Sequence, residues 1–254
     1  MLVFLAIAVQ AGRPSVDCVR IVALENSRFV EPLLGQLKQL GLQNRTTVQY
    51  ASLDQREGAG CWQQHVSAWR YLTAQGCRHS LVLEEDAIFL VKRWLRSSQI
   101  EDFIALNRTY DTLQLGMWHN GIAIGRVIIP APSHRPTWFE PLPEVRCMAR
   151  SVGDPGASHA YVISAKAAAA WRPRWGSFGT VHIDQWMKWN PLHQNFVVLP
   201  SMVFQRHHES QNMKSPITRL LEPAATGNTR THAFLERKFF YKMPGSCWRG
   251  KPHL

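Results

Sequence analysis

Several features that would assign the chain to a special class of protein are missing from its 254 residues. No apolar run reaches about 18 residues, which excludes a protein with several membrane-spanning helices. Glycine and proline are not abundant, at 16 and 15 residues, and 45% of the residues are hydrophobic. This composition excludes collagen-like and disordered chains. What is present is enough sequence to bury a sizeable core in one large domain or two small ones.

Cysteine is scarce, and its spacing gives no metal or redox motif. None of Cys18, Cys61, Cys77, Cys147 and Cys247 belongs to a C-x-x-C pair or to a Cys/His zinc spacing. An odd number leaves at least one of them without a partner in the chain. We expect most to be buried free thiols, with disulfides as the alternative.

Acidic residues are few, so the chain is strongly basic. Lys and Arg number 29 against 18 Asp and Glu, a net charge of +11, and from residue 203 onward nine Lys or Arg face three Glu. This balance suits an acidic partner, which includes an acidic membrane surface, although a solvated basic tail is the simpler interpretation. No helix-turn-helix, zinc-finger or RNA-recognition signature occurs, so we expect no specific nucleic-acid partner.

Residues 1–17 form a leading segment whose first eleven residues are mostly apolar and too short to span a bilayer. They are either the apolar part of a signal peptide or a first core strand. Glycosylation triplets begin at Asn44 and Asn107 and favour a secretory compartment. The expected location is the ER or Golgi lumen if the segment is a signal peptide, and the cytoplasm otherwise.

Strands and helices are predicted to alternate from residue 18 to residue 200, which indicates one α/β domain with a parallel sheet. The first unit is a strand over 18–24, a helix over about 28–40 with Ser27 as its cap and Gly41 at its end, and a strand over 46–50. Five prolines between residues 130 and 143 predict an irregular loop outside the core. The other predicted elements are helices over 60–75, 91–106, 165–171 and 184–189 and strands over 80–83, 112–115, 159–164 and 195–199.

Three consecutive acids, Glu84, Glu85 and Asp86, follow the apolar strand at 80–83. Neighbouring carboxylates repel one another and lose hydration near a sheet, a cost that a bound cation would offset. Ligands of open α/β sheets bind at the carboxyl ends of strands, and Mg²⁺ or Mn²⁺ prefers oxygen ligands. The alternative is a solvated acidic turn or a helix N-terminus.

The sequence around these acids resembles family 25 glycosyltransferases, which include lipooligosaccharide and procollagen galactosyltransferases. That family has a G-C-x-x-S-H-x-x-x-W helix followed by a strand ending in L-E-D-D-A. Here the matching segments are Gly60 to Trp69 and Leu81 to Ala87. Later segments agree in order and spacing over about residues 18–212: Leu115-Gly116, Ser158 to Ser164, and Ile183-Asp184.

Three positions depart from the family pattern. Gln64 stands where the family has Ser, and Glu85 stands where Asp is usual. The opening strand ends in Val-Ala-Leu-Glu-Asn-Ser at residues 22–27, where the family has I-N-L-D-R-S. The last departure concerns the nucleotide-base pocket and favours an alternative function, in which a catalytically inactive relative binds an acidic glycan or membrane surface through the basic tail.

The resemblance implies a Rossmann-like GT-A glycosyltransferase fold, with a mostly parallel central sheet and helices on both faces. The glycosyltransferase domain would span residues 18–212, and residues 213–254 would be a basic C-terminal extension. The implied reaction moves galactose or glucose from a UDP-sugar to a hydroxyl of a glycan, lipooligosaccharide or glycoprotein. The implied cofactor is Mn²⁺, or Mg²⁺ in its place.

The resemblance also assigns roles to individual residues. Asp86 is the expected metal ligand, Glu84 a second ligand or a ribose contact, and His207 a late ligand whose alternative is an exposed polar residue. Asp184 is the expected catalytic base, with helix N-cap as its alternative. The donor is expected to contact Glu84, Glu85, Asp86, Leu24, Arg206 and His65.

Three further side chains are of interest. Lys214 is a second candidate for the diphosphate, beside Arg206. Trp118 and Trp186 are candidates for stacking on a sugar. His65 has a structural alternative, because a histidine beside an apolar helical stripe is often packed and hydrogen-bonded without any ligand.

Overall fold

The computed structural model describes residues 16–51, 59–96, 98–106, 109–116, 123–124, 127–128, 138–142, 144, 148–152, 158–171, 183–189, 193–198 and 201–205. Trp118, Arg206, His207 and Lys214 lie outside these ranges, as do most of the leading segment and the whole basic extension. No helix in these ranges is both long enough and apolar enough to cross a membrane.

The first half of the chain follows the predicted alternation closely. Its elements are β1 (Cys18–Leu24), α1 (Val30–Gln39), the short 3-10 helix η2 (Gln43–Arg45), β2 (Thr46–Ala51), α2 (Ala59–Ala74) and β3 (His79–Glu84). β1 lies between β2 and β3 and is parallel to both. Gly41 and Gly76 follow α1 and α2 with φ of +70° and +69°, where glycine is favoured because it has no Cβ.

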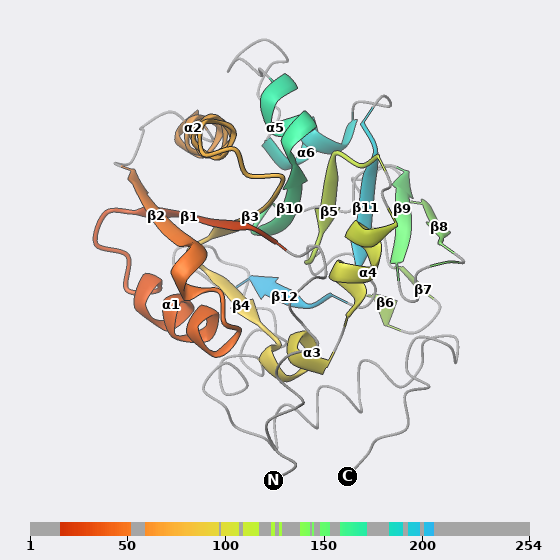
Figure 1. Cartoon of the computed structure of the whole chain (residues 1–254), viewed down its shortest axis with the longest axis horizontal. Coiled ribbons are helices and arrows are strands. Elements are labelled where there is room, and N and C mark those ends of the chain that lie inside the picture. Colours follow the sequence, from red (N-terminus) through yellow and green to blue (C-terminus); the bar gives the residue numbers. More distant parts are fainter. Residues whose placement is uncertain are drawn as a thin grey trace, which may run out of the picture.

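The main sheet has eight strands in the order β2-β1-β3-β10-β5-β11-β9-β8. Six strands point in one direction, and β10 and β9 run antiparallel to their neighbours. The α/β class is thereby confirmed (Figure 1). The added strands are β5 (Thr112–Gln114), β8 (Trp138–Pro141), β9 (Met148–Val152), β10 (Ala160–Ser164) and β11 (Asn195–Val198).

Two small sheets accompany the main one. β4 (Ala87–Phe89) pairs antiparallel with β12 (Val203–Gln205), and β6 (Ala123–Ile124) pairs with β7 (Val127–Ile128). The first of these sheets brings the chain after residue 200 back to the segment that directly follows the three acids.

Two sequence predictions about the middle of the chain were wrong. The proline-rich stretch was expected to lie outside the core, yet β8 forms the edge of the main sheet, where Pro141 is tolerated because one side of an edge strand has no partner. The helix predicted over 91–106 is two helices, α3 (Val91–Arg96) and α4 (Gln99–Ala105). Ser98 is the N-cap residue of α4, and its hydroxyl donates a hydrogen bond to the Asp102 side chain in the first turn at 2.6 Å.

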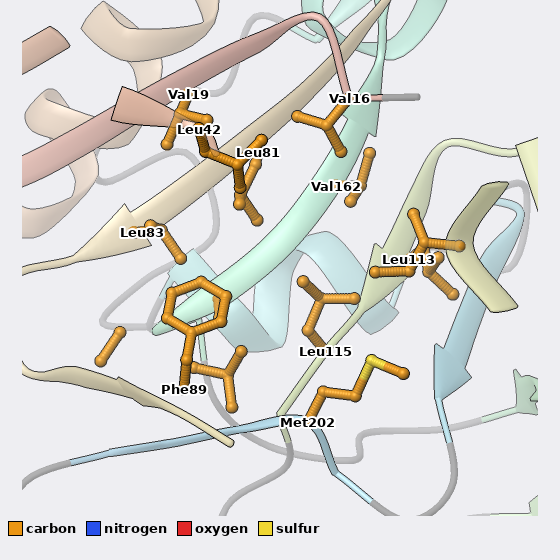
Figure 2. Packing of buried hydrophobic residues seen from close by; sticks show 14 of the residues in the cluster. Val16, Val19, Leu42, Leu81, Leu83, Phe89, Leu113, Leu115, Val162 and Met202 are labelled. Atoms are coloured by element: carbon orange, nitrogen blue, oxygen red, sulfur yellow. The ribbon is translucent and has the colours of Figure 1, made fainter. Parts of the chain in front are cut away.

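Helices cover both faces of the sheet, as predicted (Figure 1). α1 and α4 cover one face, which we call the α1 face, together with the β4–β12 pair. Its cluster of buried apolar side chains includes Leu83, Leu113 and Met202 (Figure 2). Burial of such a side chain contributes about 1.5–3 kcal/mol, so this cluster supplies much of the stability of the fold.

The other face, which we call the α2 face, is covered by α2, α5 (Ala165–Ala170) and α6 (Ile183–Trp189). Its core is aromatic: Trp69 lies 5.3 Å from Trp171 and 6.3 Å from Trp186 between ring centroids. α5 begins at Ser164, whose hydroxyl accepts a hydrogen bond from the Ala167 amide at 3.2 Å.

A disulfide joins Cys18 to Cys77, so the expectation of free thiols was wrong for this pair. Cys18 begins β1 and Cys77 precedes β3; because the two strands are neighbours, the two Cα atoms lie 6.0 Å apart. Closing a loop of 59 residues contributes about 4 kcal/mol in the chain-entropy account. Cys61 is free and exposed.

Candidate active site

The three acids lie at the carboxyl end of β3, in the turn that leads to β4. Two backbone hydrogen bonds hold the turn: Glu84 N–H donates to His159 O at 2.9 Å, and Glu85 N–H donates to Val22 O at 3.1 Å. Glu85 and Asp86 are buried, with exposed fractions of 8% and 2%. A freely solvated acidic turn therefore does not describe this segment.

The Glu84 carboxylate is fixed by two side chains. Its Oε1 lies 3.2 Å from His65 Nε2 and accepts a hydrogen bond from the Ser158 hydroxyl at 2.5 Å. Removal from water would by itself raise the pKa of Glu84, but the hydrogen bonds from His65 and Ser158 and the nearby imidazoles outweigh it and lower the pKa from 4.5 to about 2. Glu84 is therefore a carboxylate throughout the physiological pH range.

Behind Glu84, a series of hydrogen bonds between buried side chains, which we call the polar chain, crosses the α2 face. Trp69 Nε1–H donates to the Tyr161 hydroxyl at 2.8 Å, and that hydroxyl lies 2.8 Å from His65 Nδ1. Burial raises the pKa of Tyr161, so the phenol stays protonated and can donate a hydrogen bond to His65 Nδ1. His65 would then carry its own proton on Nε2 and donate it to Glu84, which satisfies every member of the chain.

His65 and Trp69 reach the same hydroxyl because they are one helical turn apart in α2. Residues at i and i+4 lie on the same side of a helix, and here that side faces β10. His65 is fully buried, so it is packed and hydrogen-bonded, which was the structural alternative for this residue. Its expected contact with the donor stays a prediction.

Asp86 is hydrogen-bonded to the last residue that the structure describes, Gln205. Gln205 Nε2–H donates to Asp86 Oδ2 at 3.0 Å, and the same residue pairs with Ala87 in the β12–β4 sheet. Arg206 and His207 are the next two residues in the sequence and lie outside the described ranges.

Asp184 belongs to α6, which packs against α2 on the same face of the sheet as Glu84. It is the second residue of α6, so it is not the N-cap of that helix. The pKa of the Cys61 thiol is raised well above its usual value, first because packing around the sulfur removes hydration and then by the negative charges of Glu84, Asp184, Asp86 and Glu85. Four carboxylates from β3, the following turn and α6 therefore act on one point near the start of α2.

The loop after β1 lies at the same edge of the sheet. Leu24, half-buried, ends β1, which is paired with β3. Asn26 follows with φ of 64°, in the left-handed region that Asn tolerates better than most residues. The Ser27 hydroxyl accepts a hydrogen bond from the Phe29 amide at 3.3 Å, and α1 begins only at Val30, so Ser27 shapes the turn before the helix.

The glycine that ends the Leu115-Gly116 pair is required by close packing. A Cβ at Gly116 would lie 2.2 Å from His159 Nε2 and 2.3 Å from the Val203 carbonyl oxygen. Three segments that border the acids therefore meet at this residue, and no other side chain fits there without movement.

The candidates Gln64 and Trp186 have structural partners. Gln64 accepts a hydrogen bond from the Gln49 side chain, which ties α2 to β2. Trp186, half-buried, packs with ring centroids 5.8 Å from Trp62 and 5.5 Å from Trp171. Trp186 thus anchors α6 against α2 and keeps Asp184 near the start of that helix.

Sequence reasoning did not single out four residues that contact the candidate site: Cys61, Ser158, Tyr161 and Gln205. A signal existed for three of them, because Cys61, Ser158 and Tyr161 belong to segments that carried the family resemblance. Gln205 had no such signal, since its contact with Asp86 joins residues 119 positions apart.

No family model and no curated protein sequence matches the chain. Among solved structures, the chain is similar to a glycosyltransferase involved in the glycosylation of the major capsid of PBCV-1. The similarity has a TM-score of 0.43 and 10% sequence identity, and it covers 71% of this chain and 80% of that chain. The function proposed below is therefore argued from the side chains of the site.

Proposed function

We propose that the chain is a metal-dependent glycosyltransferase that moves a hexose from a UDP-sugar to a hydroxyl acceptor. The observation that carries the proposal is the buried acidic turn at the carboxyl end of β3, where Glu85 and Asp86 are 8% and 2% exposed and Glu84 is held by His65 and Ser158. The charge of Asp184 acts at the neighbouring Cys61 together with theirs. Such a concentration of negative charge, partly buried, is costly unless a cation and its ligand bind there.

The donor set suits a hard divalent cation. Asp86 offers a buried carboxylate whose orientation is fixed by Gln205, and oxygen ligands of this kind fit Mn²⁺ or Mg²⁺. Glu84, already held by His65 and Ser158, suits a ribose contact or a second ligand, and His207 remains the predicted late ligand. The cation would supply charge neutralisation for the departing diphosphate.

Asp184 is proposed as the catalytic base. The acceptor oxygen would form a bond to the anomeric carbon while the bond from that carbon to the diphosphate breaks, and the electron pair would leave with UDP. The proton of the acceptor hydroxyl would pass to the Asp184 carboxylate. Its position on α6, an element separate from the β3–β4 turn, allows the base and the metal ligands to lie on different sides of the sugar.

The remaining assignments concern the nucleotide. Leu24, at the end of β1, and Arg206, directly after β12, are proposed to contact the base and the diphosphate. Membership of family 25, galactose or glucose as the sugar, and a glycan, lipooligosaccharide or glycoprotein acceptor are part of the proposal and follow from the motif resemblance. The Glu-Asn-Ser loop after Leu24 is the feature that favours a non-catalytic relative instead.

The test is UDP-sugar hydrolysis or transfer, measured with and without Mn²⁺, for the wild-type chain and two variants. We expect Asp86→Ala to lose metal-dependent turnover and Asp184→Asn to lower kcat about 10²-fold or more while UDP binding is kept. Gln64→Ser, a change toward the family residue at a half-buried position that faces Gln49 of β2, is the control and should keep its rate. An unchanged rate in Asp86→Ala would overturn the metal assignment.

A further inference from the structure

Three potential metal ligands of different chemistry gather between α2 and β3. The Cys61 sulfur, a ring nitrogen of His65 and a carboxylate oxygen of Glu84 all lie within 4.8 Å of one another. Cys61 and His65 are four residues apart in α2, so one side of the helix presents both toward the end of β3. This cluster does not include Asp86, the residue assigned above to the donor-linked cation.

The spacing within the cluster is close to that around a shared ion. Zn²⁺ lies about 2.0–2.2 Å from imidazole and carboxylate ligands, which places two such ligands in a tetrahedral site about 3.3 Å apart. His65 Nε2 and Glu84 Oε1 are 3.2 Å apart. The Cys61 sulfur lies within 4.8 Å of both atoms, so with zinc–thiolate bonds of about 2.3 Å it would have to approach by at most about 1 Å.

Both inner ligands are already oriented by other side chains. Tyr161 holds His65 through Nδ1 at 2.8 Å, and Ser158 holds Glu84 at 2.5 Å. Zinc-binding histidines commonly make such a hydrogen bond with the second ring nitrogen, which fixes the ring and leaves the first nitrogen for the metal. The side-chain positions therefore need little change to receive an ion, but the hydrogen bond between Tyr161 and His65 must reverse, so that Nδ1 donates and Nε2 is free.

A cation can reach the cluster and is attracted to it. His65 is fully buried, whereas residue Cys61 is exposed and the Glu84 side chain is 20% exposed, so an ion would enter from the side of these two residues, past the packing around the sulfur. The charges of Asp184, Asp86 and Glu85 also act at the Cys61 sulfur. A thiolate, an imidazole and a carboxylate together select Zn²⁺ over Mn²⁺ or Mg²⁺, which prefer oxygen alone.

We propose that Cys61, His65 and Glu84 form a zinc site separate from Asp86, in which Glu84 serves the zinc ion and not the predicted Mn²⁺ site. Zn²⁺ binding would release one proton, that of the Cys61 thiol. The His65 ring would carry its proton on Nδ1, donated to Tyr161, so that Nε2 is free for the metal. The site stands whether or not the chain transfers sugar.

The experiment is a Co²⁺ titration of the full chain with its Cys18–Cys77 disulfide intact, with Co²⁺ as a visible probe for zinc. We expect one equivalent of Co²⁺ to produce a thiolate-to-cobalt charge-transfer band that Zn²⁺ abolishes. Cys61→Ser should lose the band and weaken zinc binding at least about tenfold. Cys247→Ser, the matched control, should keep the band, as should Asp86→Asn, which separates this site from the donor-linked one.

A second measurement needs no variant. In the wild-type chain, Zn²⁺ should slow the alkylation of Cys61, followed by peptide mass spectrometry, and a chelator should restore the rate. A cobalt band that persists in Cys61→Ser, or an alkylation rate of Cys61 that does not respond to Zn²⁺, would overturn the proposal.

Discussion

Leu83 and Glu84 are neighbours in β3, yet their side chains enter opposite faces of the sheet and meet different surroundings. Leu83 is fully buried in the apolar cluster of the α1 face, which Figure 2 shows. Glu84 joins the polar chain of the α2 face, formed with His65, Tyr161 and Trp69. An apolar interior needs only shape and volume, whereas a buried polar chain is costly unless every member has a partner. The contrast indicates that the α1 face has an apolar interior, whereas the α2 face adds to its aromatic core a hydrogen-bonded polar chain that ends at the candidate site.

The largest effect on stability is expected from Leu83→Ala. Truncation of a fully buried leucine removes apolar contact and leaves a cavity, so the free energy of unfolding should fall by about 2–5 kcal/mol in urea titrations. UDP binding by the folded variant should not change, because the side chain lies on the α1 face. If the folded fraction of Leu83→Ala bound UDP more weakly than the wild type, the separation of roles between the two faces would be contradicted.

Glu84→Gln should cost less, and its cost should depend on pH. The pKa of Glu84 is depressed from 4.5 to about 2 in the folded chain, so its charge stabilises the fold above pH 4.5, and this contribution is lost as pH falls toward 2. The depression corresponds to at most about 3 kcal/mol. The wild type should exceed Glu84→Gln in unfolding free energy at pH 7, and the difference should shrink steadily as pH falls from 4.5 to about 2. A difference that is constant over this range would contradict the assignment.

The smallest effects come from a matched pair of tyrosines, one on each face. Tyr161 and Tyr110 both place a hydroxyl near a histidine Nδ1, at 2.8 Å from His65 and 2.7 Å from His79. Tyr161→Phe leaves two buried partners unsatisfied and should cost about 1–3 kcal/mol, whereas Tyr110→Phe frees only the half-buried His79, which water can reach, and should cost about 0.5–1.5 kcal/mol.

The activity of the same pair sharpens the comparison further. Only Tyr161→Phe should also lower the transfer rate, because it releases His65 from the orientation that serves Glu84. Equal transfer rates in Tyr161→Phe and Tyr110→Phe would indicate that the polar chain has a structural role and no role in transfer.

Local patterns predicted much of the first half of the fold. The bounds of β1 and nearly those of α2 followed from apolar runs, from a helical stripe and from glycines at the helix ends. β4 and β12 were not predicted, because strands of three residues have no period to detect and exist only through pairing with each other. β8 and the Cys18–Cys77 bond also depend on which strands are neighbours, and this is decided by the whole sheet.

The candidate site divides in the same way. The acids at 84–86 and Asp184 stood out because each follows or begins a regular element. The partners that hold them could not be read from spacing: Ser158 reaches Glu84 across 74 positions, and Tyr161 reaches His65 across 96. The sequence therefore indicated which residues carry charge, and the fold determined which of those charges are held in place.

The central claim, that the acids at the carboxyl end of β3 bind a dication together with a nucleotide diphosphate, is tested most directly by calorimetry of UDP binding with and without Mn²⁺. The account predicts a heat of UDP binding that requires Mn²⁺, is lost in Asp86→Asn and is kept in Cys247→Ser. UDP heat that is absent under both conditions, or that is the same with and without Mn²⁺, would contradict the account.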